Sequence, residues 1–228
     1  MIDSELDFIV ANFSELENKV IECMEYIPFI DINESVVSPK FVPVLMEACS
    51  LIESIFRHNT SEGGRLNLKK YSAIFEPALD LEGAKTLFLT SQLHILTPFE
   101  NWLNTSPEWW DAYNRVKHDR IGHYSESTYS HTISALAALH QVISRSEGFL
   151  APIAKAGWFN ESDRDGYSEM RLSNQVGCRP PEMPIESKLF VSATRGNFVK
   201  EKDGRISIDY WEFSDRVRTF IWVAEGWM

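Results

Sequence analysis

Hydrophobic residues recur at helical spacing along the first part of the chain. Between residues 5 and 26 they fall three and four positions apart, which predicts an amphipathic helix that Pro28 ends. The same spacing predicts a second helix, with Ser38 as its cap and Pro39 at its first position, that reaches about His58. A third, shorter helix is predicted around Leu68, Tyr71, Phe75 and Leu79.

The middle of the chain continues this pattern. Residues 83–97 predict a fourth helix, with Leu87, Leu89, Leu93 and Leu96 as its buried positions. Ser106-Pro107-Glu108 predicts a helix start, because it combines a cap, a proline and an acid near the positive end of the helix dipole. That helix is expected to reach about Arg120 and to end at Gly122. A last long helix is predicted from about Ile133 to Gly148.

The pattern changes after Gly148, where prolines and glycines become frequent and the helical period fades. Residues 188–192 predict a strand, and residues 198–210 predict a β-hairpin around Asp203-Gly204, a pair that accommodates the positive φ angles of a tight turn. A closing helix is predicted over 214–225. The predicted fold is therefore mainly α, with a helical bundle over 1–148 and a small mixed α/β region over 149–228.

Composition narrows the functional classes. The 228 residues, 44% of them hydrophobic and 24% charged, suit a globular protein that buries a core without disulfides. A net charge of -11 argues against a protein that coats nucleic acid or anionic membranes nonspecifically, so any RNA contact must come from a local basic patch. Three scattered cysteines, no signal-peptide pattern and no long apolar run predict a cytoplasmic protein without a membrane span, metal or cofactor.

The segment from Ser106 to His123 is the one with clear chemical potential. On a helix, Asn114 and His118 lie four residues apart on one face, and Tyr113 and Lys117 form an adjoining stripe. Positive charge comes from Arg115, Lys117 and Arg120, and His123 follows just past the predicted helix end. A histidine beside cations and an amide suits metal-independent RNA cleavage, in which one group takes the 2′-hydroxyl proton and another protonates the leaving oxygen.

A structural interpretation of the same residues is also open. Tyr113, Asn114, Lys117 and His118 can form a polar network that locks two helices together, with Trp109 and Trp110 as core anchors. Buried polar groups with satisfied hydrogen bonds are commoner in proteins than catalytic groups. Spacing alone does not choose between the two interpretations.

Tyr113-Asn114-Arg115-Val116-Lys117-His118 resembles the signature of the HEPN superfamily of helical-bundle proteins. That signature is an arginine, a polar residue that is often asparagine, three variable residues and a histidine, followed by an apolar helix such as the one predicted over 133–143. Asn114 and His118 match, whereas Tyr113 occupies the arginine position. The segment is also similar to a WWxxYNxxKHxR pattern of uncharacterised bacterial proteins.

The resemblance covers residues 1–148 and implies a homodimer in an RNA-handling, defence or stress system. One hypothesis is a metal-independent endoribonuclease with His118, Asn114 and Arg120 as catalytic residues and Arg115, Lys117, His123 and Tyr113 as substrate-binding residues. The other is a non-catalytic protein-interaction or scaffolding module. Tyr113 then marks a degenerate motif, because the ribonucleases of the family depend on the arginine, and the C-terminal region is the partner surface.

Overall fold

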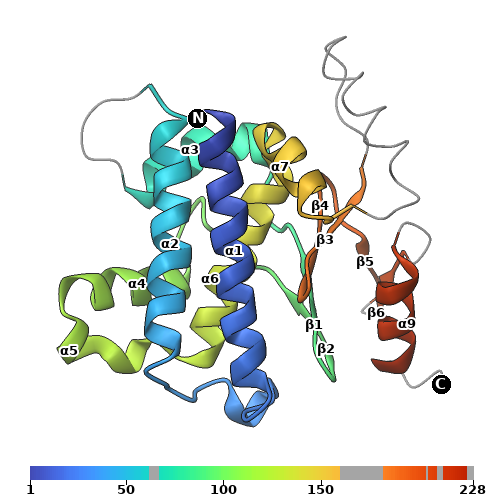
Figure 1. The fold of residues 1–228 in the computed structure, drawn as a ribbon, viewed down its shortest axis with the longest axis horizontal. Helices are drawn as coiled ribbons and strands as arrows, with labels where there is room; N and C mark the ends of the chain where they lie inside the picture. The colour runs from blue at the N-terminus through green and yellow to red at the C-terminus, as the bar shows by residue number, and fades with distance from the viewer. Residues whose placement is uncertain (62–66, 160–181, 204, 210–212, 225–228) are drawn as a thin grey trace.

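The computed structural model places a helical bundle on one face of an antiparallel sheet and a smaller hairpin-and-helix layer on the other face (Figure 1). The structure describes residues 1–61, 67–159, 182–203, 205–209 and 213–224. Within this part of the chain, no helix is long and apolar enough to cross a bilayer.

The bundle is organised around one buried helix, α6 (Tyr129–Arg145), in which every residue from Ala135 to Arg145 is buried. A helix that is buried on all sides needs neighbours all round. Three of these neighbours are α1 (Asp3–Met24), α2 (Phe41–His58) and α4 (Glu108–His118). Further elements are α3 (Leu68–Leu79), α5 (Arg120–His123), α7 (Leu150–Lys155) and the 3-10 turns η1 (Asp31–Asn33), η2 (Tyr124–Glu126) and η3 (Glu147–Phe149).

The sheet has the strand order β2-β1-β4-β3. Its strands are β1 (Thr86–Leu89), β2 (Leu93–Leu96), β3 (Pro184–Glu186) and β4 (Phe190–Ala193). Phe88 and Phe190 belong to the bundle core, whereas Leu87, Leu89 and Val191 belong to a second hydrophobic cluster. That cluster is completed by the hairpin of β5 (Val199–Lys202) and β6 (Arg205–Ile208) and by α9 (Asp215–Ala224).

The helix predicted over 83–97 is wrong, because this segment forms the antiparallel hairpin of β1 and β2. Leu87 and Leu89 are two residues apart and face the second cluster, while Phe88 between them faces the bundle. This period of two is the alternation of a strand. Both faces of the strand are buried, so the sequence shows a continuous apolar run that spacing did not separate from a helix.

The other predicted elements are confirmed, with small shifts at their ends. α2 begins at Phe41 instead of Pro39, and the Ser38 hydroxyl accepts a hydrogen bond from the Lys40 N–H. The C-terminal hairpin forms with Lys202 opposite Arg205 and Asp203 at φ 52°; Gly204 and Tyr210 lie outside the described residues. The mainly helical fold with a mixed C-terminal part is therefore confirmed. Cys23 and Cys49 are buried free thiols.

A buried polar chain crosses the boundary between the bundle and the sheet. His140 on α6 forms a hydrogen bond of 2.9 Å between its Nδ1 and the Ser192 hydroxyl, which lies 2.8 Å from the Thr86 hydroxyl. The His140 ring stacks on Trp158 with their centroids 5.1 Å apart. Burial lowers the pKa of His140 to about 3, so the imidazole is neutral in the folded protein.

We predict that His140→Phe flattens the acid dependence of stability. The unfolded chain protonates His140 below its ordinary pKa of 6.5, whereas the folded protein does so only near 3, so stability is lost as the pH falls through this window. The slope from this group approaches about 1.4 kcal/mol per pH unit. Urea unfolding of both proteins between about pH 7 and about pH 4 measures it. Equal slopes would contradict the assignment.

Candidate functional site

Helices α4 and α5 and the following Tyr124 form an elbow, residues 108–124, which projects from the bundle on the side away from the sheet (Figure 1). The bend is at Asp119, whose φ of -146° and ψ of 89° end the first helix. The Asp119 carboxylate then caps the next turn by accepting the Gly122 N–H at 2.9 Å. A Cβ at position 122 would meet that carboxylate, so a larger residue would force the Asp119 side chain to move away from its cap position.

The predicted ends of this helix are therefore corrected. It ends at His118, and Gly122 lies inside the short α5 instead of terminating one long helix. The aspartate explains the difference, since its side chain offers the backbone an alternative to continuing the helix. At the other end Pro107 holds the cap position, and the Ser106 hydroxyl donates to Asp111 at 2.6 Å instead of accepting from the helix backbone.

The inner face of α4 anchors the elbow to the bundle. Trp109 and Trp110 are buried, as the packing interpretation predicted. The Trp109 indole N–H donates to the Pro98 carbonyl at 2.6 Å, and its ring meets Phe99 edge to face. These contacts fix the rotation of α4, and hence which residues face α2 and which face solvent.

Tyr113 faces α2 and is 2% exposed. Its hydroxyl donates to Glu53 Oε2 at 3.0 Å, and Lys117 Nζ donates to the same oxygen at 2.9 Å. Arg57 donates to the other Glu53 oxygen at 2.7 Å. We call these four residues the Glu53 cluster. It joins α2 to α4 and includes two of the predicted substrate-binding residues.

The protonation states in the Glu53 cluster follow from its burial and charges. Burial alone would raise the pKa of Glu53, but the hydrogen bonds from Lys117 and Tyr113 and the charges of Lys117 and Arg57 lower it below its ordinary value. Burial raises the pKa of Tyr113 to about 12. Tyr113 is therefore a neutral hydrogen-bond donor to an ionised carboxylate at neutral pH, and it cannot replace the positive charge of an arginine.

The remaining predicted site residues lie on the outer side of the elbow. Arg115 pairs with Glu126 at 3.3 Å. Asn114 is half-buried, His118 and Arg120 are exposed and His123 is half-buried, and within the described residues their side chains make no hydrogen bond or ion pair. Ile121 and Tyr124, which the sequence interpretation did not single out, are 89% and 57% exposed.

The structure thus divides the predicted site into two parts. Tyr113 and Lys117 meet on Glu53, whereas His118, Arg120 and His123 lie toward the tip of the elbow. Asn114 and His118 share a face of α4 but form no hydrogen bond with each other. The sequence interpretation missed Glu53 and Arg57. One signal could have indicated the carboxylate: Tyr113 and Lys117 form a stripe of hydrogen-bond donors on α4, and such donors need an acceptor on the helix that packs against them.

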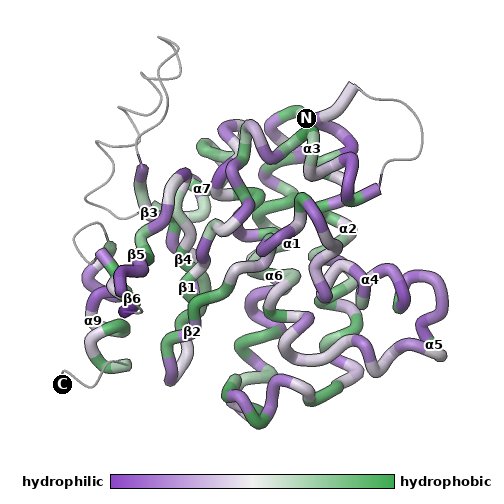
Figure 2. The backbone as a smooth tube through the Cα atoms, turned by 180° about the vertical axis from the view of Figure 1, so that it is seen from behind, coloured by the Kyte–Doolittle hydropathy of each residue, from purple (hydrophilic) through white to green (hydrophobic). Residues whose placement is uncertain are grey.

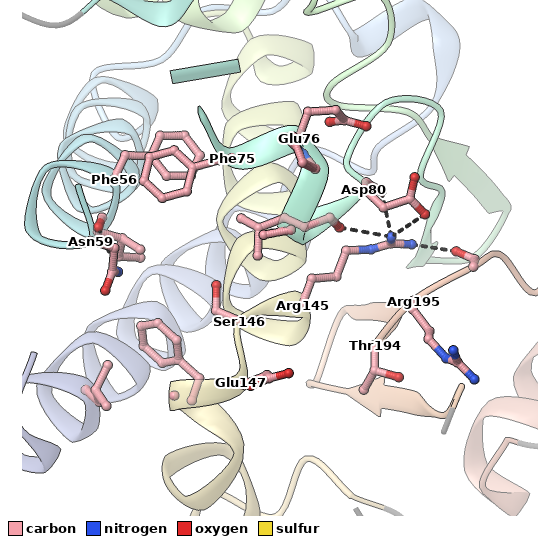
Figure 3. A pocket seen from close by; sticks show the side chains of 18 of the residues that line it. Phe56, Asn59, Phe75, Glu76, Asp80, Arg145, Ser146, Glu147, Thr194 and Arg195 are labelled. Atoms are coloured by element: carbon pink, nitrogen blue, oxygen red, sulfur yellow. Dashed lines mark hydrogen bonds and ion pairs between the residues drawn. The ribbon is translucent and has the colours of Figure 1, made fainter. Parts of the chain in front are cut away.

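The pocket in Figure 3 is lined by none of the predicted site residues. It has a volume of about 1220 Å³ and lies where the ends of α3 and α6 meet the turn after β4, with Phe56 and Phe75 on one side and Arg145 on the other. The Arg145 guanidinium donates to the carbonyls of Leu79, Asp80 and Gly196. Arg145 therefore joins the end of α6 to the end of α3 and to the turn after β4. Because its guanidinium is used in this way, the described lining of the pocket offers no free buried cation to a ligand.

Comparisons with known protein families, with curated proteins and with solved structures find no match to this chain. The function has to be argued from the geometry of the elbow and the Glu53 cluster.

We predict that Tyr113→Phe lowers the free energy of unfolding by about 1 kcal/mol, because it removes a part-buried hydrogen bond to Glu53 and leaves the ring packing in place. Tyr124→Phe is the matched control, since that hydroxyl is on an exposed side chain with no partner among the described residues. Chemical denaturation measures both variants. An equal loss in both would show that the Glu53 bond contributes nothing specific.

Proposed function

We propose that this chain is a HEPN-like protein of an RNA-handling or defence system, and that it acts as a binding module instead of a nuclease. The observation that carries the proposal is the position of Tyr113. It stands where the HEPN signature has an arginine, and it is buried against Glu53 instead of facing the solvent-exposed His118.

The charges in the elbow support binding over cleavage. Cleavage by acid–base catalysis needs cations that stabilise the developing charge on the phosphate oxygens. Tyr113 is neutral, Lys117 is paired with Glu53, and Arg115 is paired with Glu126. Of the cations predicted for the site, Arg120 alone remains unpaired among the described residues. This leaves too little positive charge beside His118 for an efficient nuclease centre.

The tip of the elbow, residues 120–124, provides the binding surface. It combines the guanidinium of Arg120, the exposed aliphatic chain of Ile121 and the exposed ring of Tyr124. Arginine and tyrosine are enriched among the residues that dominate protein–protein binding energy, and an exposed isoleucine beside them adds apolar area. We infer that the main partner of the elbow is a different protein.

A second candidate is RNA bound without cleavage. The unpaired Arg120 favours it, because a guanidinium can hold a phosphate while Tyr124 stacks on an unpaired base. The net charge of -11 limits such binding to this local contact.

We predict no His118-dependent RNA cleavage. The purified protein and its His118→Ala variant are incubated with mixed single-stranded and structured RNAs in EDTA, after circular dichroism has shown that both are folded. Both should leave the RNAs intact. Cleavage by the wild type that disappears in His118→Ala would instead establish the metal-independent endoribonuclease and reject the binding-module proposal.

We predict that a photo-crosslinking amino acid at position 121 captures one dominant partner in the native cells. The same amino acid at Ile206, which is 60% exposed on β6, is the matched control. A protein captured from position 121 and absent at position 206 supports the main proposal, and RNA captured with that selectivity supports the second candidate. The same products from both positions would contradict a binding role of the elbow.

A further inference from the structure

The two edge strands of the sheet differ in how their outer edges are protected. The strand order makes β2 and β3 the edges. In β3, Pro184 has no N–H, and the N–H of Glu186 donates to the Trp158 carbonyl at 2.8 Å. Proline and a covering segment are two usual ways to prevent an edge strand from pairing with another chain.

The outer edge of β2 is covered by no proline and no pairing segment in the part of the chain that the structure describes. The N–H of Leu89 donates to the Leu189 carbonyl, so Leu89 directs its backbone groups toward β4. Backbone groups alternate in direction along a strand, so Leu87 also faces β4, whereas Thr86 and Phe88 direct their groups toward β2. Because Phe88 lies opposite His94, the alternation turns the N–H and C=O groups of Leu93 and Ile95 outward. Among the described residues none pairs with these four groups.

The surroundings of β2 favour pairing with another strand. From Thr86 to Phe99 the chain contains no aspartate, glutamate, lysine or arginine. Figure 2 shows hydrophobic residues along β1 and β2 and a hydrophilic turn between them. Leu93 and Ile95 are half-buried, and they pack against the second hydrophobic cluster together with the half-buried Phe220 of α9. An uncharged, apolar edge of this kind is what proteins usually avoid exposing.

We propose that β2 is an interaction surface on which a second copy of this chain adds its own β2. The two strands run antiparallel about a twofold axis at His94, which places Leu93 of one copy opposite Ile95 of the other. Both residues direct an N–H and a C=O outward. Each of the two Leu93–Ile95 pairs across the axis therefore exchanges two hydrogen bonds, and the two strands together form four. The sheet becomes continuous across the dimer.

The sequence of β2 identifies a second copy as the occupant. The two outward residues are symmetric about His94, so the strand is complementary to itself, as an isologous interface requires. Each copy carries a net charge of -11, so the approach of two copies meets less repulsion where charge is absent, and the uncharged run around β2 is such a place. A charged peptide would find no ion-pair partner on this strand.

The test is sedimentation of the full chain over a wide concentration range. We expect a monomer–dimer equilibrium that Ile95→Pro weakens about tenfold or more, because the proline removes an outward N–H from each copy without breaking the ladder to β1. The elbow variant Ile121→Asp should leave this equilibrium unchanged. A chain that stays monomeric at all concentrations, or a dimer weakened by Ile121→Asp and not by Ile95→Pro, overturns the proposal.

A cross-linking experiment tests the register and does not depend on the folding of the proline variant. Leu93→Cys and Ile95→Cys are made separately in a Cys178→Ser background, and they are oxidised alone and as a mixture. The mixture should give a disulfide-linked dimer at several times the yield of either variant alone, because residue 93 lies opposite residue 95 of the other copy. Equal yields in all three samples would overturn the proposed register and twofold axis.

Discussion

The sheet carries large apolar side chains on both faces, and this requires a covering layer on each side. Phe88 and Phe190 project into the bundle, and Leu87, Leu89 and Val191 project into the second cluster. The first face is covered by α6, which is itself buried on all sides and therefore needs α1, α2 and α4 around it. The second face is covered by the C-terminal hairpin and α9. The sheet thus joins residues from both predicted regions of the chain in one layer.

Buried polar groups hold the connections between these layers. Glu17 on α1 accepts hydrogen bonds of 2.6 Å from both the Ser187 hydroxyl and the Leu189 N–H, which positions the turn between β3 and β4. Burial raises the pKa of Glu17, although these bonds oppose the rise. Arg145, at the C-terminal end of α6, has an equivalent role because it donates to three backbone carbonyls. Since their hydrogen bonds serve the fold, Glu17 and Arg145 have a structural role that is separate from the candidate site in the elbow.

Elements with one apolar face can be predicted from the local spacing of their hydrophobic residues. Features that depend on contacts between residues far apart in the sequence cannot. α1 and α3 have one apolar face each, and their spacing identifies them. β1 is buried on both faces, so the leucines of its hairpin with β2 gave a false helical signal. Candidate site residues were found within one segment, but the pairing of Tyr113 with Glu53 joins positions 60 residues apart. No spacing rule within the segment could have indicated which face of α4 meets α2.

The geometry of α4 limits what one copy of the elbow can do. Positions 113 and 118 are five residues apart, which separates them by about 140° around a helix. Position 113 faces α2 while His118 faces solvent, so a single copy does not direct both toward one phosphate.

The elbow and β2 lie on opposite sides of the bundle (Figure 1). Pairing through β2 would therefore leave both elbows free and separate. Two weak contacts in one dimer bind a repeated or dimeric partner far more tightly than either contact alone, and this favours binding over catalysis as the use of the elbow.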